Sequence, residues 1–239
     1  MPHALENVEN KVAVLRRSSL FSSIPEDELS KLAQFAKVQD AKPRKVIFHK
    51  GDPGTQMFLI ISGRVKTTTL SEDGKEVVFN IMDAGEVFGE ISLLDGKERT
   101  ATITTMESCR FLVLERRDFI PFLEQHPKVA IHLLTVISSR LRSADEMLED
   151  TLFRNLPARL AKKLLSLAES YGREDDNGNT RIELKLSQQE LGQLVGTSRE
   201  SVNKQLRYWE RTGMLTVEQR HITLLEEGEL EHIALSAED

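Results

Sequence analysis

Two helix-start patterns separated by one glycine constrain the C-terminal third of the 239-residue chain most strongly. Ser187 followed by Glu190 is a capping box, which predicts that a helix begins directly after the serine. Gly196 predicts the end of that helix, and Thr197 followed by Glu200 forms a second capping box. The pattern predicts two short helices joined by a tight turn, as in a helix-turn-helix, although an ordinary helical hairpin fits it too.

The second predicted helix carries hydrogen-bonding side chains in its first turns, where a recognition helix contacts base edges. Arg199 can donate two hydrogen bonds to guanine, and Glu200 can accept one from the amino group of cytosine. A solvated helix face is the alternative for each charge. The expected DNA contacts on this helix are Ser198, Arg199, Glu200, Asn203, Lys204 and Arg207, the last suited to phosphate. Residues 215–225 predict a β-hairpin, or wing.

The net charge of −6 weighs against DNA binding, but the charge is unevenly distributed. Residues 197–211 hold four basic and two acidic side chains, a local net charge of +2, whereas the chain after residue 225 holds acids and no Lys or Arg. Because the local field steers a protein to phosphate, the acidic total does not exclude DNA as a partner.

Residues 41–114 predict short strands, because runs of β-forming residues alternate with turn signals. The runs are 46–48, 57–61, 77–81 and 111–114, and the turns are 51–54, 62–63, 73–74 and 95–96. Such spacing favours an antiparallel sandwich or barrel, of which a jelly roll is one form. A short helix over 24–35 is expected before it.

A heptad pattern runs through the predicted helix over 127–152. Its positions are Leu134, Ile137, Leu141, Ala144, Leu148 and Thr151. We call this narrow stripe the seam. It predicts a parallel helix contact between two copies of the chain. Packing of the helix against its own domain is the alternative. The expected solvated flanks are Arg140, Arg142, Asp145, Glu146, Glu149 and Asp150. Asn155 then predicts a helix cap, and Asn177-Gly178 predicts a hairpin.

From about residue 20 to 225 the sequence resembles the cyclic-AMP receptor protein/FNR (CRP/FNR) superfamily of bacterial transcription regulators. The segments GEISLLDGKERTATI and LSQQELGQLVGTSRESVNKQL carry the resemblance. It implies an α+β fold with a double-stranded β-helix (jelly-roll) cyclic-nucleotide-binding domain over 1–126. A dimerisation helix and hinge over 127–153 and a winged helix-turn-helix domain over 154–239 would follow.

The residues around Gly89 and Arg99 resemble the phosphate-binding cassette of cyclic-nucleotide domains. Arg99 can neutralise a cyclic phosphate and Thr100 can add a hydroxyl and an N–H, while Glu90 can accept from a ribose 2′-hydroxyl. Gly89 permits close approach of the backbone. A short helix beginning at Glu90 could turn its N–H groups to the phosphate. The expected cassette is Gly89, Glu90, Ile91, Ser92, Arg99, Thr100 and Ala101; a degenerate structural remnant is the alternative.

The resemblance also assigns DNA contacts. Arg199 and Glu200 would bind guanine and cytosine in a TGTGA-like palindrome, and Lys204 takes a third position that is often Arg. Lysine lacks the planar fork, so base selection there is expected to be looser. Ser187 and Gln189 match positions that contact phosphate.

The effector is the open question of the sequence. Ala144 and Asp145 align with a hydroxyl pair that binds adenine in the family, and Asp145 could instead accept from guanine. We rank cyclic AMP first and cyclic GMP second. A regulator of the same fold that needs no nucleotide, or senses another ligand, is an alternative.

Other classes of function fit less well. An enzyme with a nucleotide-sensing module would need a catalytic constellation, and none is spelled out, so no enzymatic activity is expected. The single cysteine excludes an all-cysteine iron–sulfur site, and the scattered histidines suggest no metal. No membrane partner is expected. We expect a homodimer, and we expect it in the cytoplasm. RNA polymerase is an expected partner, by weak analogy through the turn at 71–73.

Overall fold

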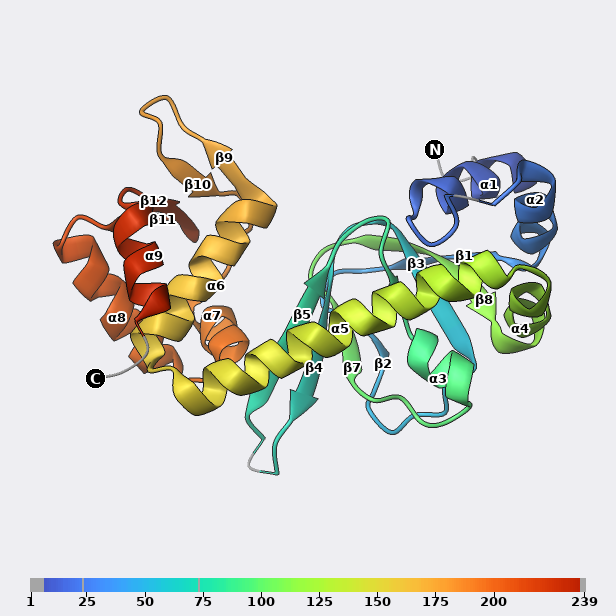
Figure 1. Ribbon diagram of the computed structural model, residues 1–239, viewed down its shortest axis with the longest axis horizontal. Helices are drawn as coiled ribbons and strands as arrows, with labels where there is room; N and C mark the ends of the chain where they lie inside the picture. Colours follow the sequence, from blue (N-terminus) through green and yellow to red (C-terminus); the bar gives the residue numbers. More distant parts are fainter. Residues whose placement is uncertain (1–6, 23, 73, 237–239) are drawn as a thin grey trace. The chain divides into compact units, whose positions relative to one another are not determined.

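A computed structural model describes residues 7–22, 24–72 and 74–236 of the chain. The chain divides after Leu141 into two compact units, each of which mixes helices and strands (Figure 1). Asp73 of the predicted polymerase-contacting turn lies outside the described residues, as do His3, Glu238 and Asp239.

The N-terminal unit is built on two antiparallel sheets, which confirms the predicted fold class. Within the described residues one sheet has the strand order β1-β8-β3-β6 and the other the order β2-β7-β4-β5. The strands are β1 (Lys37–Ala41), β2 (Val46–Phe48), β3 (Gln56–Ser62), β4 (Val65–Leu70), β5 (Glu76–Met82), β6 (Val87–Phe88), β7 (Thr102–Thr105) and β8 (Cys109–Glu115). The helices are α1 (Val8–Arg17), α2 (Glu26–Phe35), α3 (Glu90–Asp95), α4 (Arg116–Gln125) and the first part of α5 (Pro127–Phe153).

The position of β3 in the fold explains why its sequence is a continuous apolar run rather than an alternating one. Successive side chains of a strand point to opposite faces, and both faces of β3 are covered. Met57 and Leu59 belong to an outer cluster shared with the helices, whereas Phe58 and Ile60 belong to an inter-sheet cluster. The sheet is therefore buried on both sides at β3.

Aromatic rings organise the inter-sheet cluster. Phe58 stacks on Phe88 with ring centroids 4.9 Å apart, and Phe111 meets both rings edge-on. Phe48 from β2 lies 5.9 Å from Phe58 and 6.0 Å from Phe88. Such aromatic pairs add stability beyond the area they bury, and they fix the position of β2 against the opposite sheet.

Three helices cover the outer cluster, and Figure 1 shows α1, α2 and α4 gathered at one end of the N-terminal unit. Leu15 of α1, Leu29 of α2 and Phe119 of α4 are all fully buried there. Helix α2 confirms the predicted segment, whereas α1 and α4 were not predicted. Val129 and Leu133 from the start of α5 complete this core.

The C-terminal unit combines helices with a single sheet in its described part. The sheet has the strand order β11-β12-β10-β9, so the two predicted hairpins join through β12 and β10. Its elements are α6 (Leu156–Tyr171), β9 (Gly172–Glu174), β10 (Thr180–Ile182), α7 (Gln188–Val195), α8 (Arg199–Arg211), β11 (Leu215–Glu218), β12 (His221–Leu224) and α9 (Glu227–Leu235). Helix α9, which packs against α6, was not predicted.

The helix caps follow the sequence closely, with one correction. Asn155 accepts from the N–H three residues on, and Ser187 forms both halves of its capping box. Gly196 ends α7 in the left-handed conformation, with φ at 69°. The second predicted capping box is wrong by one residue, because Ser198 rather than Thr197 caps α8. Glu200 is exposed in the first turn of the helix.

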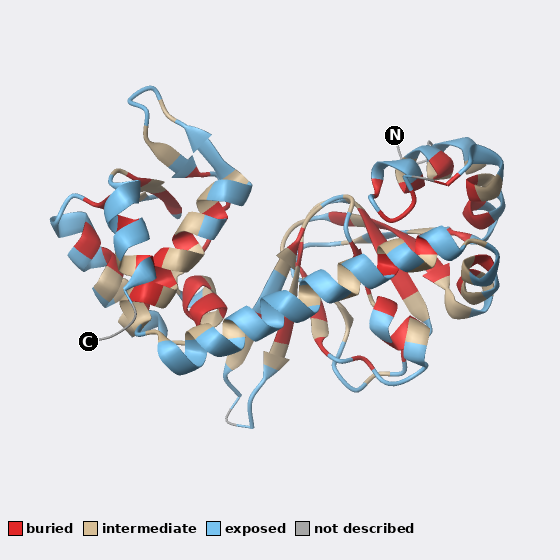
Figure 2. Cartoon of the chain, viewed as in Figure 1, coloured by how far each residue is buried: buried red, intermediate tan, exposed pale blue. Residues whose placement is uncertain are grey.

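Helix α5 has one face on its own core and another face in solvent. Leu133 is buried, and Ile137 packs partly against the outer cluster. At Ile137 the helix therefore packs against its own domain, which was the alternative interpretation of the heptad pattern. Leu134 and Leu141 are each 62% exposed, and Leu148 is 59% exposed. Figure 2 shows the exposed surface continuing along most of the helix. This exposed leucine row is what a seam between two copies would look like in one chain.

Candidate functional sites

The predicted cassette is built around the turn from β6 into α3. Gly89 caps α3 with φ at 79°, a conformation that favours glycine. A Cβ atom at this position would lie 2.7 Å from Nη1 of Arg99 and 3.0 Å from the carbonyl oxygen of Gln56. The glycine therefore makes room for Arg99 itself, so the structure ties the two predicted cassette residues directly together.

Arg99 is almost completely buried, at 5% exposure. Its Nη1 donates to the carbonyl of Gly89 at 2.9 Å, and its guanidinium carbon lies 4.1 Å from the centre of the Phe48 ring. Its Nε is buried and has no hydrogen-bond partner among the described residues. Burial lowers the pKa of Arg99 from its ordinary value, while the nearby Glu90 and Asp52 carboxylates oppose that shift.

Glu90 lies beside this arginine and is fully buried. Arg140 of α5 donates through Nη1 to one carboxylate oxygen of Glu90 and through Nη2 to the carbonyl of Val87, and it lies 3.4 Å from the sulfur of Met82. The other carboxylate oxygen has no partner in the described part of the chain. The prediction that Arg140 is a solvated flank is therefore wrong. Sequence reasoning missed it because its partner lies 50 residues away.

The remaining cassette residues divide into buried and exposed ones. Ser92 is buried and donates to the carbonyl of Glu98 at 3.1 Å, and Ala101 is 9% exposed. Thr100 and Ile91 are exposed. The structure thus brings together two unsatisfied buried groups of opposite charge with an exposed hydroxyl next to one of them in sequence.

The predicted base-contacting residues of the nucleotide site lie on α5. Ala144 and Asp145 are both exposed. Their role stays a prediction.

Most of the residues expected to contact DNA are exposed on helix α8. Buried Val202, Leu206 and Trp209 fix its inner face. Arg199, Glu200, Lys204 and Arg207 are exposed on it, together with its cap Ser198, whereas Asn203 is half-buried. Hydrogen bonds from the Glu200 backbone and from Ser198 lower the pKa of the Glu200 carboxyl. The charged form, which can only accept hydrogen bonds, is therefore favoured.

Three contacts in this region were not predicted. Gln188 of α7 donates to the side-chain oxygen of Asn203 at 3.2 Å, so that the first turns of the two helices are tied together. Ser187 donates its hydroxyl to Glu190 at 2.6 Å, and Arg220 at the tip of the wing reaches the same carboxylate at 2.8 Å. The hydroxyl proton of Ser187 is therefore already engaged within the capping box. Gln189 is exposed.

Within the C-terminal unit, a cluster of ionic contacts joins the end of α5 to other helices. Asp150 accepts from Nε of Arg154 at 2.8 Å and from Lys162 of α6 at 2.9 Å. Arg154 also donates to the carbonyl of Ala234 in α9. The prediction that Asp150 is merely solvated is wrong, because its carboxylate joins α5 and α6 and, through Arg154, reaches α9.

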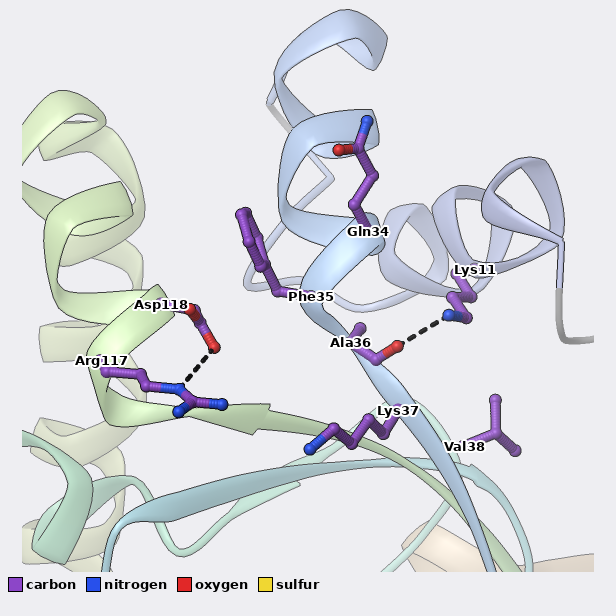
Figure 3. A pocket seen from close by; sticks show the side chains of 8 residues that line it. All are labelled: Lys11, Gln34, Phe35, Ala36, Lys37, Val38, Arg117 and Asp118. Carbon is purple, nitrogen blue, oxygen red and sulfur yellow. Dashed lines mark hydrogen bonds and ion pairs between the residues drawn. The ribbon is translucent and has the colours of Figure 1, made fainter.

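A separate hollow of about 620 Å³ lies between α1, α2 and α4 (Figure 3). Its lysines and arginine all have acceptors: Lys11 donates to the carbonyl of Ala36 at 2.7 Å, Lys37 pairs with Glu115 at 3.1 Å, and Arg117 lies 3.6 Å from Asp118. None of the predicted cassette residues lines it. It lacks the unsatisfied buried groups that distinguish the cassette.

Among the described residues, no group of three His, Cys, Asp or Glu side chains lies close enough to hold a metal ion. None of the described helices combines the length and the apolar character that a membrane crossing needs.

Comparison with known proteins matches both units. The cyclic nucleotide-binding domain family matches residues 38–126, and the Crp-like helix-turn-helix domain family matches residues 158–233. A CRP-like cAMP-activated global transcriptional regulator of Mycobacterium tuberculosis is 32% identical over 88% of the chain and 94% of the relative. A cyclic AMP receptor protein of Thermus thermophilus is 32% identical over 89% of the chain and 97% of the relative.

Solved structures agree with the fold. A CRP/FNR-family transcriptional regulator of Thermus thermophilus matches with a TM-score of 0.66 at 25% identity, covering 84% of the chain and all of that structure. The regulator CLP of Xanthomonas campestris has a TM-score of 0.75 at 21% identity, covering 84% of the chain and 99% of that structure, and supports the fold alone. The chain belongs to the CRP/FNR family of DNA-binding transcription regulators.

Proposed function

We propose that this regulator binds palindromic DNA as a homodimer and that a cyclic nucleotide controls the binding. The observation that carries the proposal is the pair of buried, unsatisfied groups in the cassette, Nε of Arg99 and one oxygen of Glu90. Buried polar groups are almost always paired, so an unpaired donor beside an unpaired acceptor indicates a ligand. A cyclic phosphate supplies the acceptor and a ribose hydroxyl supplies the donor.

Cyclic AMP is the first candidate effector and cyclic GMP the second. The names of the Mycobacterium and Thermus relatives support cyclic AMP. Asp145, in the predicted base-contacting pair with Ala144, supports cyclic GMP, because a carboxylate can accept from the guanine N1–H and amino group. In the cassette, Gly89, Ile91, Ser92, Thr100 and Ala101 would complete the pocket.

Arg140 offers a route from the nucleotide to DNA. A ribose hydroxyl that donates to the unpaired oxygen of Glu90 would share this carboxylate with Arg140, which belongs to α5. Because α5 is one continuous helix from Pro127 to Phe153, a change at Arg140 can act along it. A shift of the exposed seam would then reset the spacing of two recognition helices, which must lie about 34 Å apart to meet one turn of DNA.

On the DNA, Arg199 and Glu200 would select guanine and cytosine, with Lys204 and Asn203 beside them. The predicted phosphate contacts are Ser187, Gln189, Ser198 and Arg207. The exposed Ser71 and Glu72 are the proposed contact with RNA polymerase, and the cytoplasm is the proposed compartment. The relatives are regulators, which supports a role without enzymatic activity.

Isothermal calorimetry with cyclic AMP, cyclic GMP and cyclic di-GMP tests the effector. We expect one of the first two to bind, with Arg99→Gln greatly weakening that binding. Arg117→Gln is a matched control, because Arg117 is an exposed arginine of the same unit outside the cassette. Binding that survives Arg99→Gln unchanged, or binding of cyclic di-GMP alone, would contradict the proposed pocket.

A further inference from the structure

Arg99 is a buried cation with little compensation from hydrogen bonds. Its side chain makes one hydrogen bond, from Nη1 to the carbonyl of Gly89, and its Nε has no partner in the described chain. Burying a charge is costly unless the charge is paired and hydrogen-bonded. The nearby Glu90 and Asp52 carboxylates offset part of the charge, but neither is hydrogen-bonded to the guanidinium, so its orientation must be fixed by other contacts.

The ring of Phe48 makes such a contact with the guanidinium. The guanidinium carbon lies 4.1 Å from the ring centre, well within the range of a cation–π contact. The ring is itself held by Phe58 and Phe88, whose centroids lie 5.9 Å and 6.0 Å away. Cation–π contacts are strongest where water is excluded, as it is at 5% exposure of Arg99.

The chain just after Phe48 holds the backbone of Arg99 as well. Gly51 donates its N–H to the carbonyl of Arg99 at 2.9 Å, and the N–H of Arg99 donates to the carbonyl of Asp52 at 2.8 Å. Both ends of the arginine are thus fixed by the segment from 48 to 52. Such double support keeps a binding group within the narrow tolerance that preorganisation requires.

We propose that Phe48 is a positioning residue for anion binding, which selects the edge of Arg99 that faces the ligand. The inference rests on the proposed nucleotide function. With one face of the guanidinium against the ring and Nη1 on Gly89, the Nε edge is left for phosphate oxygens. A planar guanidinium binds two oxygens along one edge, so its orientation decides the affinity.

The test compares three variants for folding, nucleotide affinity and arginine mobility. Phe48→Leu removes the ring but keeps an apolar side chain, and Phe48→Tyr keeps the ring. Ile47→Ala is the matched control, because Ile47 packs against the same inter-sheet cluster without a ring to cover Arg99. Calorimetry with cyclic AMP and cyclic GMP at one salt concentration gives affinity, and ¹⁵N relaxation of the Arg99 Nε–H in nucleotide-free protein gives mobility.

We expect Phe48→Leu to weaken nucleotide binding by about tenfold and to loosen the Arg99 Nε–H. Phe48→Tyr and Ile47→Ala should stay within about twofold of the parent, which is roughly 0.4 kcal/mol. Equal losses in Phe48→Leu and Ile47→Ala would overturn the inference, because general packing would then be the cause. A tyrosine variant as weak as the leucine variant would overturn it as well.

Failure of the proposed function gives a different result. If the parent protein binds neither nucleotide, the effector assignment is wrong, and mobility alone decides the role of Phe48. An Arg99 as ordered in Phe48→Leu as in the parent would then overturn the positioning role. Loosening in Phe48→Leu alone would support it for an anion of another kind.

Discussion

Replacing Arg140 by alanine should destabilise the N-terminal unit by about 3 kcal/mol. The arginine pairs with Glu90, whose side chain is 1% exposed, so the substitution leaves a carboxylate buried without its ionic partner. Removing one partner of a buried pair costs about 3–5 kcal/mol. We take the lower end because the Arg140 side chain is itself 29% exposed and the charge of Arg99 lies nearby.

Denaturant unfolding followed by circular dichroism measures this loss at a fixed protein concentration, since dimerisation would make stability concentration-dependent. Fluorescence of Trp209, the only tryptophan, checks that the C-terminal unit stays folded. Arg142→Ala is the matched control, because Arg142 is an exposed arginine two residues away, and its cost should be within about 0.5 kcal/mol.

A double-mutant cycle with Glu90→Gln separates the ion pair from packing. Neutralising the buried carboxylate removes most of the penalty, so Arg140→Ala should cost much less in the Glu90→Gln background. The reasoning is refuted if Arg140→Ala costs no more than Arg142→Ala, or if its cost is the same in both backgrounds.

Three further predictions follow from the structure. Leu141→Glu places a charge in the exposed seam, so sedimentation should show a monomer at concentrations where the parent is dimeric; a dimer of unchanged affinity would rule out the seam. Ser198→Ala removes the cap of α8 and should lower the stability of the C-terminal unit by about 1 kcal/mol, measured by Trp209 fluorescence; no loss would mean that the cap bond is not formed. Cys109 is buried, and burial raises the pKa of its thiol, so a thiol reagent near pH 8 should modify native protein far more slowly than denatured protein; equal rates would contradict its burial.

Local sequence patterns predicted the secondary structure best where a single turn or strand decides the outcome. The capping box at Ser187, the glycine at 196 and the apolar run of β3 each act over a few residues, and each is found as expected. The one-residue error at Thr197 arose because two hydroxyl residues stand side by side and either can cap. Helix α9 was missed because no side-chain cap marks its start, and its packing against α6 is a tertiary effect.

The sequence motifs of the candidate sites could be predicted, but the residues that contact them from other elements could not. Arg99 and Glu90 were found from local spacing, whereas Arg140 and Phe48 approach them from other elements. Its charge alone could not reveal the role of Arg140, because a lone arginine on a helix is more often solvated. Asp150 was misjudged for the same reason, since its ionic partner Lys162 lies on the next helix.

The central claim, that a cyclic nucleotide controls DNA binding, is tested most directly by fluorescence anisotropy with a labelled TGTGA-like palindrome. The titration is run at one salt concentration with no nucleotide, with cyclic AMP and with cyclic GMP, because affinity for DNA depends strongly on salt. The account predicts that one nucleotide raises the affinity for the palindrome at least about tenfold, a typical allosteric coupling, and that Arg99→Gln abolishes the increase. Equal affinity under all three conditions would contradict it.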